Sequence, residues 1–415
     1  MRSLNFIPNQ YNFASRAIKI IMSIQPTWLN AVYFENILRN FFHNQELIVK
    51  NIELSPGANV GDGNLSQVFR VKVTTTKKKI SIITKVLSTN LFTETINQAL
   101  NVYDVEKITL QTMLPKMLTK LPNPLKFYPE LYHADDAKRT LFLEDLCEDG
   151  YQICKHESLG LDLQHSLLIM EALAKLHATS YLVFKENPDL IKNFKSSFYC
   201  KENWEVVDKM TTRNPRRGMA AVMNDLKLPA EYKEKLKNAL SQDMSTKMIK
   251  SWELNNDCMN VLLHNDCWVN NVMFKYDKGS VKDVKLIDFQ IATYNCFAFD
   301  LIGFIFSSTS TEVRLNSLEN LMDHYYSVFT DIAGNVENFS KDIMWKEFNE
   351  RLFTGFIDLI THTPWVLAPP KKVVVDLDAL LNNEDLADNI EMFKNPKFLE
   401  SVEKLLPYFI KHNVI

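Results

Sequence analysis

The sequence has few cysteines, few glycines and no long apolar run. Its six cysteines are spread over 415 residues without a C-x-x-C pair, which argues against a disulfide framework or a structural zinc site and suits reduced thiols. An apolar piece at 17–22 is interrupted by Lys19 and is too short for a signal peptide or a membrane span. No other run reaches spanning length. We therefore expect no membrane association and, by default, a cytoplasmic protein.

Basic residues are not in excess either. The net charge is −3, with 23% charged and 46% hydrophobic residues, so the composition is that of an ordinary globular protein and excludes a typical nucleic-acid binder. No internal repeat or low-complexity tract is visible. Because 415 residues exceed what one hydrophobic core usually organises, two lobes are expected.

Glycine is scarce, with ten in the chain, yet three glycines cluster before a predicted β-hairpin. The stretch "SQVFRVKVTTTKKKISIITKVL" alternates apolar and polar residues on both sides of a polar turn, which predicts two antiparallel strands. Clustered glycines where a strand begins allow the backbone to approach a ligand closely, phosphate among the candidates. A plain surface loop is the alternative. The three glycines are Gly57, Gly61 and Gly63.

A lysine and a glutamate follow in an order that suggests a pair. Lys85 lies among apolar residues in "SIITKVL", so it either snorkels at an edge or pairs with a carboxylate. The predicted helix 92–117 offers Glu106, flanked by apolar residues at helical spacing. Considered alone, Glu106 is interpreted as a solvent-exposed helix residue. Considered together with Lys85, an ion pair between the two residues is plausible.

Two further segments have both a functional and a structural interpretation. The apolar stretch "TLFLEDL", residues 140–146, is either the linker between lobes, with backbone groups for a flat heterocycle, or an ordinary edge strand. The stretch "LDLQHSLLIMEALAKLHATSYL" has the apolar periodicity of a core helix. His177 on that face is expected to be a hydrogen-bonded core histidine.

The stretch "LLHNDCWVNNVMFKYD" carries the clearest chemical signal. His264, Asp266 and Asn271 have the spacing H-x-D-x-x-x-x-N of a catalytic loop for phosphoryl transfer. In that chemistry, Asp266 accepts the proton of an attacking hydroxyl, His264 braces the loop, and Asn271 offers an oxygen to Mg²⁺. Magnesium needs a second hard ligand, and Asp288 in "VKLIDFQ" supplies it at the end of an apolar strand.

These motifs together resemble the ecdysteroid-kinase-like family of insects, related to choline kinases and aminoglycoside phosphotransferases. Besides the lysine, glutamate and "FLEDL", the resemblance rests on "QPTWLN", "LAKLHATS", "LHNDCWVNNVMF", "LIDFQ" and the pair Asp300-Leu301. It spans roughly residues 25–415. It implies a two-lobed, protein-kinase-like α+β fold, with a small β-rich N-terminal lobe and a larger, mainly helical C-terminal lobe.

The resemblance also implies domain limits and ligands. We expect an unassigned extension at 1–24, a nucleotide-binding lobe at 25–143, a linker at 144–150 and a catalytic lobe at 151–415. ATP and Mg²⁺ are the implied cofactors, with Asn271 and Asp288 as metal ligands. The residues implied to bind the nucleotide are Lys85, which Glu106 orients, Gly61 and Gly63 in the loop, and Glu144, Asp145 and Leu146 in the linker.

Two departures from the family pattern stand out. Asn265 replaces the usual glycine between His and Asp, a tolerable change if the position needs positive φ, since asparagine accepts it better than most residues. The glycine-rich loop lacks G-x-G-x-x-G. The chain also has no A-P-E motif after Asp288, which favours a small-molecule acceptor over a peptide.

The resemblance therefore implies an ATP-dependent kinase, active as a monomer, that phosphorylates a hydroxyl of an ecdysteroid or another lipophilic or xenobiotic alcohol. The apolar C-terminal third suits such an acceptor, although core packing explains the same residues equally well. Two alternatives stay open: a catalytically silent nucleotide-binding protein, and a choline- or sugar-type kinase with a polar acceptor site.

Overall fold

The computed structural model describes residues 26–57, 65–154, 160–337, 339–367 and 387–415. These residues fall into two compact units. The first contains 67–86 and 132–145 together with the described part of 1–63, and the second contains 87–131 and 146–415 with a short piece at 64–66. Gly61, Gly63 and the expected extension 1–24 lie outside the described residues.

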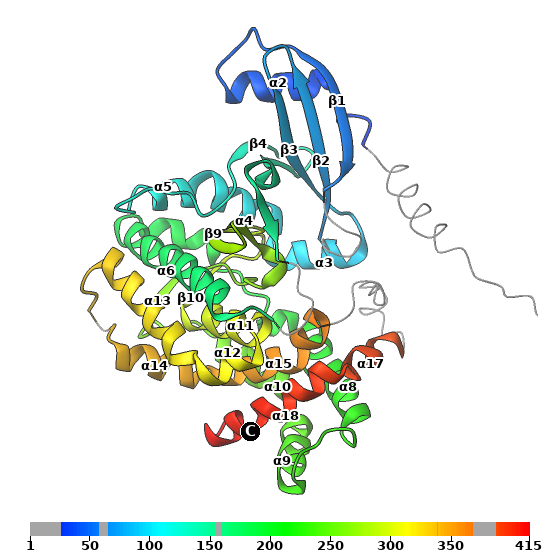
Figure 1. Cartoon of the computed structure of the whole chain (residues 1–415), viewed down its shortest axis with the longest axis vertical. Coiled ribbons are helices and arrows are strands. Elements are labelled where there is room, and N and C mark those ends of the chain that lie inside the picture. Colours follow the sequence, from blue (N-terminus) through cyan, green and yellow to red (C-terminus); the bar gives the residue numbers. More distant parts are fainter. Residues whose placement is uncertain (1–25, 58–64, 155–159, 338, 368–386) are drawn as a thin grey trace, which may run out of the picture. The chain divides into compact units, whose positions relative to one another are not determined.

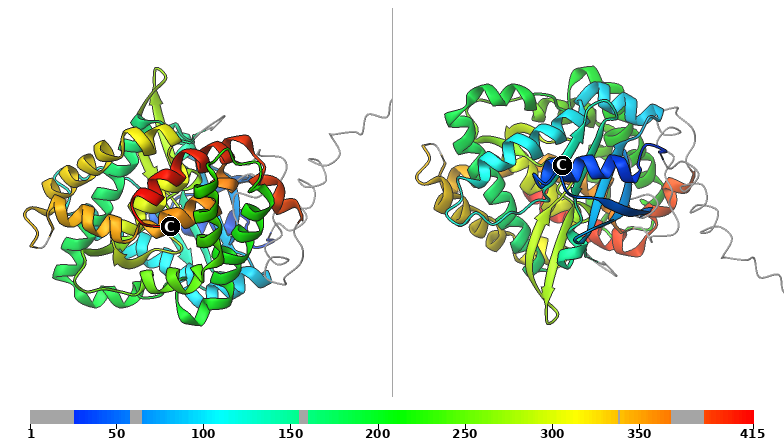
Figure 2. Two further views of the ribbon diagram at one scale, coloured as in Figure 1. Left: turned by 90° about the horizontal axis from the view of Figure 1, so that it is seen from below. Right: turned by 90° about the horizontal axis from the view of Figure 1, so that it is seen from above.

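The first unit is a sheet with one helix against it. Its five strands are hydrogen-bonded in the order β1-β2-β3-β5-β4, and the helix α2 lies across one face (Figures 1 and 2). The elements are α2(Ala31–Phe41), β1(Val49–Pro56), β2(Ser66–Thr75), β3(Lys79–Leu87), β4(Leu131–Asp135) and β5(Thr140–Glu144).

Helix α2 forms because its sequence has a cap and an apolar face. The Asn30 side chain accepts a hydrogen bond from the Tyr33 amide at 3.1 Å, which satisfies a donor that the first turn would otherwise leave unpaired. Phe34, Ile37 and Leu38 then recur at helical spacing and are buried. They join the inward-facing residues of the sheet in one hydrophobic core.

The predicted hairpin is present. β2 and β3 are neighbours in the sheet, and the Thr75 amide closes the turn by donating to the Lys78 carbonyl at 2.9 Å. The expected strand at 140–146 is β5, which ends at Glu144 and continues as the short 3-10 helix η2(Leu146–Asp149). Strand β1, antiparallel to β2, was not predicted.

The expected helix 92–117 is interrupted. It consists of α3(Leu91–Leu100), α4(Val102–Ile108), the π-helical turn η1(Thr109–Met113) and α5(Leu114–Leu118). The break lies at Asn101, whose φ of 53° is left-handed, a conformation that asparagine adopts more easily than most residues and that ends a regular helix.

The second unit is mainly helical and is built around α6(Leu163–Glu186), which packs against α13, α5 and β7. By length and composition alone this helix could cross a membrane, but 67% of its apolar window is buried inside the unit, so we interpret it as a core helix. The other longer helices of this unit are α8(Asn214–Val222), α9(Ala230–Ser241), α10(Met244–Trp252), α11(Ala298–Ser308), α13(Leu318–Ala333), α14(Lys341–Glu350), α15(Leu352–Val366) and α18(Pro396–Lys411).

Shorter helical turns connect the longer helices. α12 precedes α13, and α17 precedes α18. The turns are η3(Pro188–Phe194), η4(Lys201–Asn203), α7(Trp204–Asp208), η5(Lys209–Arg213), η6(Val269–Asn271), α12(Thr311–Asn316) and α17(Ala387–Phe393).

Two small sheets complete the second unit. β7(Asn260–Leu263) pairs with β10(Thr293–Cys296), whereas β8(Val272–Asp277) lies between β6(Tyr151–Ile153) and β9(Ser280–Leu286). The hairpin of β8 and β9 projects from the helices of its unit (Figure 2). The stretch that follows β7 therefore passes from one small sheet to the other, which is where the catalytic loop was expected.

The expected domain limits stay a prediction, although two observations bear on them. The chain passes from the first unit to the second between Asp145 and Leu146, inside the expected linker. Residues 87–131, which we assigned to the N-terminal lobe from the sequence, cluster with the second unit.

Candidate active site

The polar stretch after β7 forms a loop in which the expected base and the expected amide touch. The Asn271 side-chain amide donates to the Asp266 carboxylate at 2.7 Å and to the Asp266 backbone carbonyl at 2.9 Å. The turn η6, which ends at Asn271, brings the two residues together. Asn271 is buried, whereas Asp266 is partly exposed. A buried amide thus fixes one side of a carboxylate that solvent can reach.

The residue before Asp288 connects this loop to the end of β9. The Ile287 amide donates to the Asn271 carbonyl at 3.0 Å, and the Ile287 carbonyl accepts from the Nε2 atom of His264 at 3.0 Å. His264, Asn271 and Asp288 are therefore gathered at one place, as their order in the sequence led us to expect.

His264 is fully buried and supports the loop through both ring nitrogens. Its Nδ1 atom accepts a hydrogen bond from the Asp266 amide at 3.3 Å. Because Nδ1 accepts, the proton of the neutral ring is on Nε2, where it donates to Ile287. The ring is thus a neutral brace with one donor and one acceptor in use.

Asn265 has a left-handed backbone conformation, with φ 65°, which glycine adopts without strain. Its side-chain amide donates to the Ile291 carbonyl at 3.0 Å, a contact that glycine could not make. Asp288 also has a positive φ, 68°. Nothing in the sequence had indicated that Asp288 has a left-handed backbone conformation.

Asp300 holds the loop through hydrogen bonds to its backbone amides, a role that the sequence did not reveal. One carboxylate oxygen accepts the amide of His264 and the other accepts the amide of Asn265, each at 2.7 Å. Asp300 is buried in α11 and is the one charged residue of that apolar helix. An acidic residue in such a helix was the available signal, because a buried charge must have partners.

His177 is the core histidine that we expected, but it belongs to the same network. Its Nε2 atom lies 3.0 Å from Asp300 and its Nδ1 atom 2.9 Å from the Tyr325 hydroxyl. Burial raises the pKa of Tyr325 well above its ordinary value, so the hydroxyl stays protonated and donates to His177. Asp300 is thereby fixed by α6 and α13 while it fixes the loop that carries Asp266.

Two serines on neighbouring helices hold the strand and turn on either side of the loop. The Ser180 hydroxyl of α6 accepts from the Leu262 amide, and the Ser308 hydroxyl of α11 accepts from the Val269 amide, both at 3.0 Å. Both serines are fully buried. The conformation of the loop is therefore set by side chains from two helices, α6 and α11, and not by the loop alone.

The residues expected on the nucleotide side lie in both units. Lys85 is buried on β3 opposite Leu141 of β5, in the first unit, and Glu106 is buried on α4, in the second. The expected pair stays a prediction. Gly61 and Gly63 lie outside the described residues.

The expected linker residues differ in character. Glu144 ends β5 opposite Ile82, and Leu146 is buried at the start of η2. The Asp145 carboxylate accepts hydrogen bonds from Arg70 at 2.7 Å and from Ser81 at 2.6 Å. The Asp145 carboxylate is therefore held by two residues of the first unit.

An aromatic stack lies on one side of the loop. Trp252 stacks on Phe299 with ring centroids 3.9 Å apart, and Tyr199 lies over Trp252 at 4.8 Å. Phe299 is adjacent to Asp300. The segment before Tyr199 is held by Thr293, whose hydroxyl donates to the carbonyls of Phe194 and Ser196. Because Thr293 pairs with Leu263, the stack is tied to the strand that leads into His264.

A second carboxylate lies close to the same loop. Asp358 of α15 is buried and accepts a hydrogen bond from the His362 ring at 2.8 Å. A Cβ atom added to Gly303, one helical turn beyond Asp300, would lie 3.9 Å from the Asp358 carboxylate. Asp358 therefore faces α11 next to the turn that carries Asp300.

Charges near Asp358 balance it. Burial lowers the pKa of His362, but the hydrogen bond to Asp358 and the negative charges of Asp358 and Asp266 raise it more, so the net shift is upward. About half of the His362 side chain is exposed to solvent. Burial lowers the pKa of Arg314 to about 9 while Asp358 opposes the shift, so Arg314 is cationic at neutral pH. The charge of Asp266 also contributes to the raised pKa of Tyr199, which is mainly due to burial.

Two sequence comparisons with known proteins both find kinase-like relatives of this chain. A model of the ecdysteroid kinase-like family matches residues 60–337. An uncharacterized kinase-like protein of Caenorhabditis elegans is 24% identical over 206 residues, which are 48% of this chain and 51% of that protein. The chain thus spans about half the length of that relative.

Among solved structures, the chain is similar to a choline kinase from Cryptosporidium parvum, with 15% identity, TM-score 0.45 and coverage of 97% and 98% of the two chains. It is also similar to a Plasmodium vivax ethanolamine kinase, with 13% identity, TM-score 0.45 and coverage of 98% and 99%. The expected protein-kinase-like α+β fold, with a small β-rich part and a larger helical part, is confirmed. Because the family model covers more than half of its residues, the chain belongs to the ecdysteroid kinase-like family.

Proposed function

We propose that the protein transfers the γ-phosphate of ATP to a hydroxyl group of a small, uncharged, lipophilic molecule such as an ecdysteroid. The observation that carries the proposal is the contact between Asp266 and Asn271 in a loop that Asp300, His264 and Ile287 hold in place. Phosphoryl transfer depends mainly on positioning and charge stabilisation, and a loop fixed at this many points supplies the positioning.

In this proposal Asp266 is the base. As the acceptor oxygen bonds to the γ-phosphorus, its proton passes to the Asp266 carboxylate and the bond from phosphorus to the bridging oxygen of ADP breaks. Asn271 donates to one oxygen of Asp266, which orients the carboxylate. Burial keeps the neighbouring Cys267 thiol neutral by raising its pKa, so no competing thiolate forms beside the base.

Asn271 and Asp288 are chemically suited to bind Mg²⁺. The Asn271 amide nitrogen is used by its bonds to Asp266, so the side-chain oxygen is the group that Asn271 can offer to a cation. Asp288 adds a carboxylate beside Ile287. An amide oxygen and one carboxylate are suitable hard ligands for Mg²⁺, which when bound would neutralise charge on the phosphate oxygens.

The charge balance around Asp358 supports an uncharged acceptor. A choline-type acceptor is a cation and needs a carboxylate or an aromatic cage without a resident cation. Asp358 already accepts a hydrogen bond from His362 and interacts electrostatically with the cationic Arg314. Of the aromatic stack, Trp252 and Phe299 are buried, and Tyr199, which is partly exposed, offers apolar ring surface instead.

The test is phosphate transfer from ATP to a panel of ecdysteroids, plant phenolic and glycoside alcohols, and choline. We expect magnesium-dependent product with the uncharged alcohols and a loss of at least about 100-fold in kcat for Asp266→Asn. The exposed Asp257 is the matched control, since Asp257→Asn should leave kcat unchanged. No product from the parent protein would overturn the enzyme, a preference for choline would overturn the acceptor class, and equal activity of Asp266→Asn would overturn the base.

A further inference from the structure

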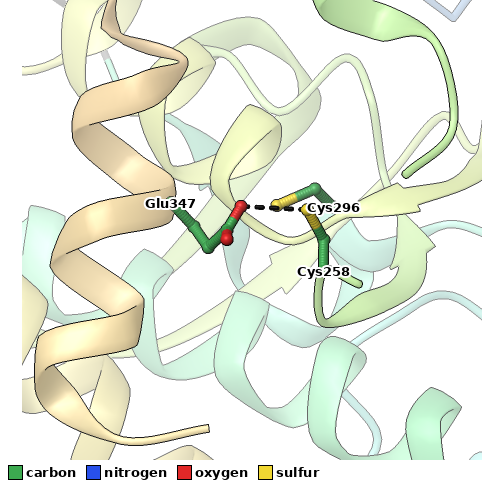
Figure 3. Close-up of side chains that lie close together, drawn as sticks. All are labelled: Cys258, Cys296 and Glu347. Atoms are coloured by element: carbon green, nitrogen blue, oxygen red, sulfur yellow. Dashed lines mark hydrogen bonds between the residues drawn. The ribbon is translucent and has the colours of Figure 1, made fainter. Parts of the chain in front are cut away.

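Two cysteines and a glutamate meet in the second unit outside the catalytic loop (Figure 3). Cys258 lies just before β7, Cys296 ends β10 and Glu347 lies on α14. The two sulfur atoms and a carboxylate oxygen of Glu347 are all within 4.8 Å of one another. Such a group can in principle bind a metal ion or react as a pair of thiols.

Strand pairing brings the two cysteines together although they are far apart in the sequence. Cys296 is opposite Asn260 in the ladder of β7 and β10, and the Phe297 amide donates to the Met259 carbonyl at 3.2 Å. Cys258 is thus on the strand extension that faces Cys296. The absence of a C-x-x-C motif had hidden this proximity.

A resident cation argues against a metal ion at this site. Arg351, the C-cap residue of α14, donates to the Cys258 sulfur at 2.8 Å and to the Glu347 carboxylate at 2.5 Å. A divalent ion bound by the same two groups would lie beside this guanidinium, and like charges at such distances repel strongly. The negative charge of the cluster is therefore balanced by the protein itself.

The same cation favours a thiolate at Cys258. The hydrogen bond with Cys296 lowers the pKa of Cys258, and Arg351 adds to this effect, while burial and Glu347 oppose it. Burial raises the pKa of Cys296 well above its ordinary value. Cys258 is partly exposed and Cys296 is fully buried. The less buried of the two residues thus has the more acidic thiol, and a neutral thiol lies beside it.

We propose that Cys258 and Cys296 are an oxidation site that converts to a disulfide with peroxides, with Cys258 as the attacking sulfur and Cys296 as the resolving sulfur. In the first step the Cys258 thiolate attacks hydrogen peroxide; a bond from sulfur to oxygen forms, the bond between the oxygens breaks, and hydroxide leaves to become water. The Cys296 thiol then attacks the sulfenic sulfur and releases a second water. Sulfur loses two electrons and peroxide gains two.

The experiment treats the full chain with hydrogen peroxide and maps its peptides without reduction. We expect a peptide pair joined through Cys258 and Cys296. Before the disulfide forms, labelling with a thiol reagent should modify Cys258 at least about tenfold faster than Cys200, because one unit of pKa changes the thiolate fraction about tenfold. Cys200 is an internal control, since it is also partly exposed and burial raises its pKa.

Variants separate the two steps. With Cys296→Ser the disulfide should be lost and a sulfenic acid should accumulate on Cys258, detected with a sulfenic-acid probe. Arg351→Lys keeps a cation, whereas Arg351→Gln should slow the labelling of Cys258 by about the same tenfold. Unfolding of an Arg351 variant would be seen by circular dichroism, and the Cys296→Ser result decides in that case.

Three results would overturn the proposal. The first is equal labelling of Cys258 and Cys200, and the second is oxidation of both Cys258 and Cys200 by peroxide without a disulfide between Cys258 and Cys296. The third is stoichiometric binding of added Zn²⁺ that Cys258→Ser abolishes, which would make the cluster a metal site. None of these measurements requires kinase activity, so the oxidation site and the proposed function fail independently.

Discussion

Asn265 combines a strained backbone conformation with two hydrogen bonds that hold it. A residue other than glycine costs about 1–2 kcal/mol in the left-handed region, and asparagine pays less than most because its side chain can bond locally. Here the amide donates to Asp300 and the side chain to Ile291. The departure from the family's glycine is therefore compatible with an intact loop.

We predict that Asn265→Gly retains most of the catalytic rate, whereas Asn265→Ala lowers both kcat and stability. Glycine keeps φ at 65° without strain and loses one hydrogen bond, worth about 1 kcal/mol, while alanine loses the bond and adds the strain. Steady-state kinetics and chemical unfolding of the two variants measure this difference. If alanine and glycine behave alike, the positive φ is not what the position requires.

Helices α11 and α15 approach each other closely at a glycine. A Cβ atom on Gly355 of α15 would lie 2.6 Å from the Phe306 ring and 3.0 Å from Ile302, far closer than carbon atoms pack. Gly303 of α11 is different, since a Cβ atom there would have one neighbour, the Asp358 carboxylate at 3.9 Å. The two glycines therefore form a matched pair on the same helix interface.

Gly355→Ala should lower the free energy of unfolding by about 1–2 kcal/mol, because overpacking costs more than the helix propensity that alanine adds. Gly303→Ala should leave it unchanged or raise it by up to about 1 kcal/mol. Urea unfolding followed by circular dichroism gives both values. A stabilised Gly355→Ala would mean that the two helices can separate at no cost.

Sequence periodicity predicted the elements whose burial is regular, and it failed where a single residue changes the chain direction. The hairpin of β2 and β3 and the core helix α6 followed from alternation and helical spacing. The break at Asn101 did not, because its cause is a left-handed backbone and not a change in hydrophobic pattern. Strand β1 was missed because five of its eight residues are exposed and its burial is irregular.

The candidate site was predictable as a set of residues but not as a network. Spacing pointed to His264, Asp266, Asn271 and Asp288, whereas Asp300, Ser180 and Ser308 act through backbone amides of distant segments. Such contacts leave no spacing in the sequence. They become visible only when the fold brings the helices and the loop together.

For the whole molecule, the use of ATP is the activity to test, and Lys85 of the first unit is the residue that we propose to bind the nucleotide. We predict that Lys85→Ala lowers kcat/KM for ATP by at least about 100-fold while the circular dichroism spectrum and Tm stay near those of the parent. Lys79→Ala is the control, because Lys79 begins the same strand and is exposed. If Lys85→Ala unfolds, the buried lysine is a structural residue, and the nucleotide role assigned to it is wrong.

The side chains that fix the loop between β7 and β8 come from α6 and α11 with support from α13, whereas the polar and partly exposed groups proposed near the acceptor are Tyr199 and, from α15, Asp358. The two sets share few residues. On the proposed function, substitutions that alter which alcohol is accepted can therefore accumulate without disturbing the base. A lineage exposed to changing toxins or hormones could diversify its substrates on this scaffold while the phosphoryl-transfer chemistry stays constant.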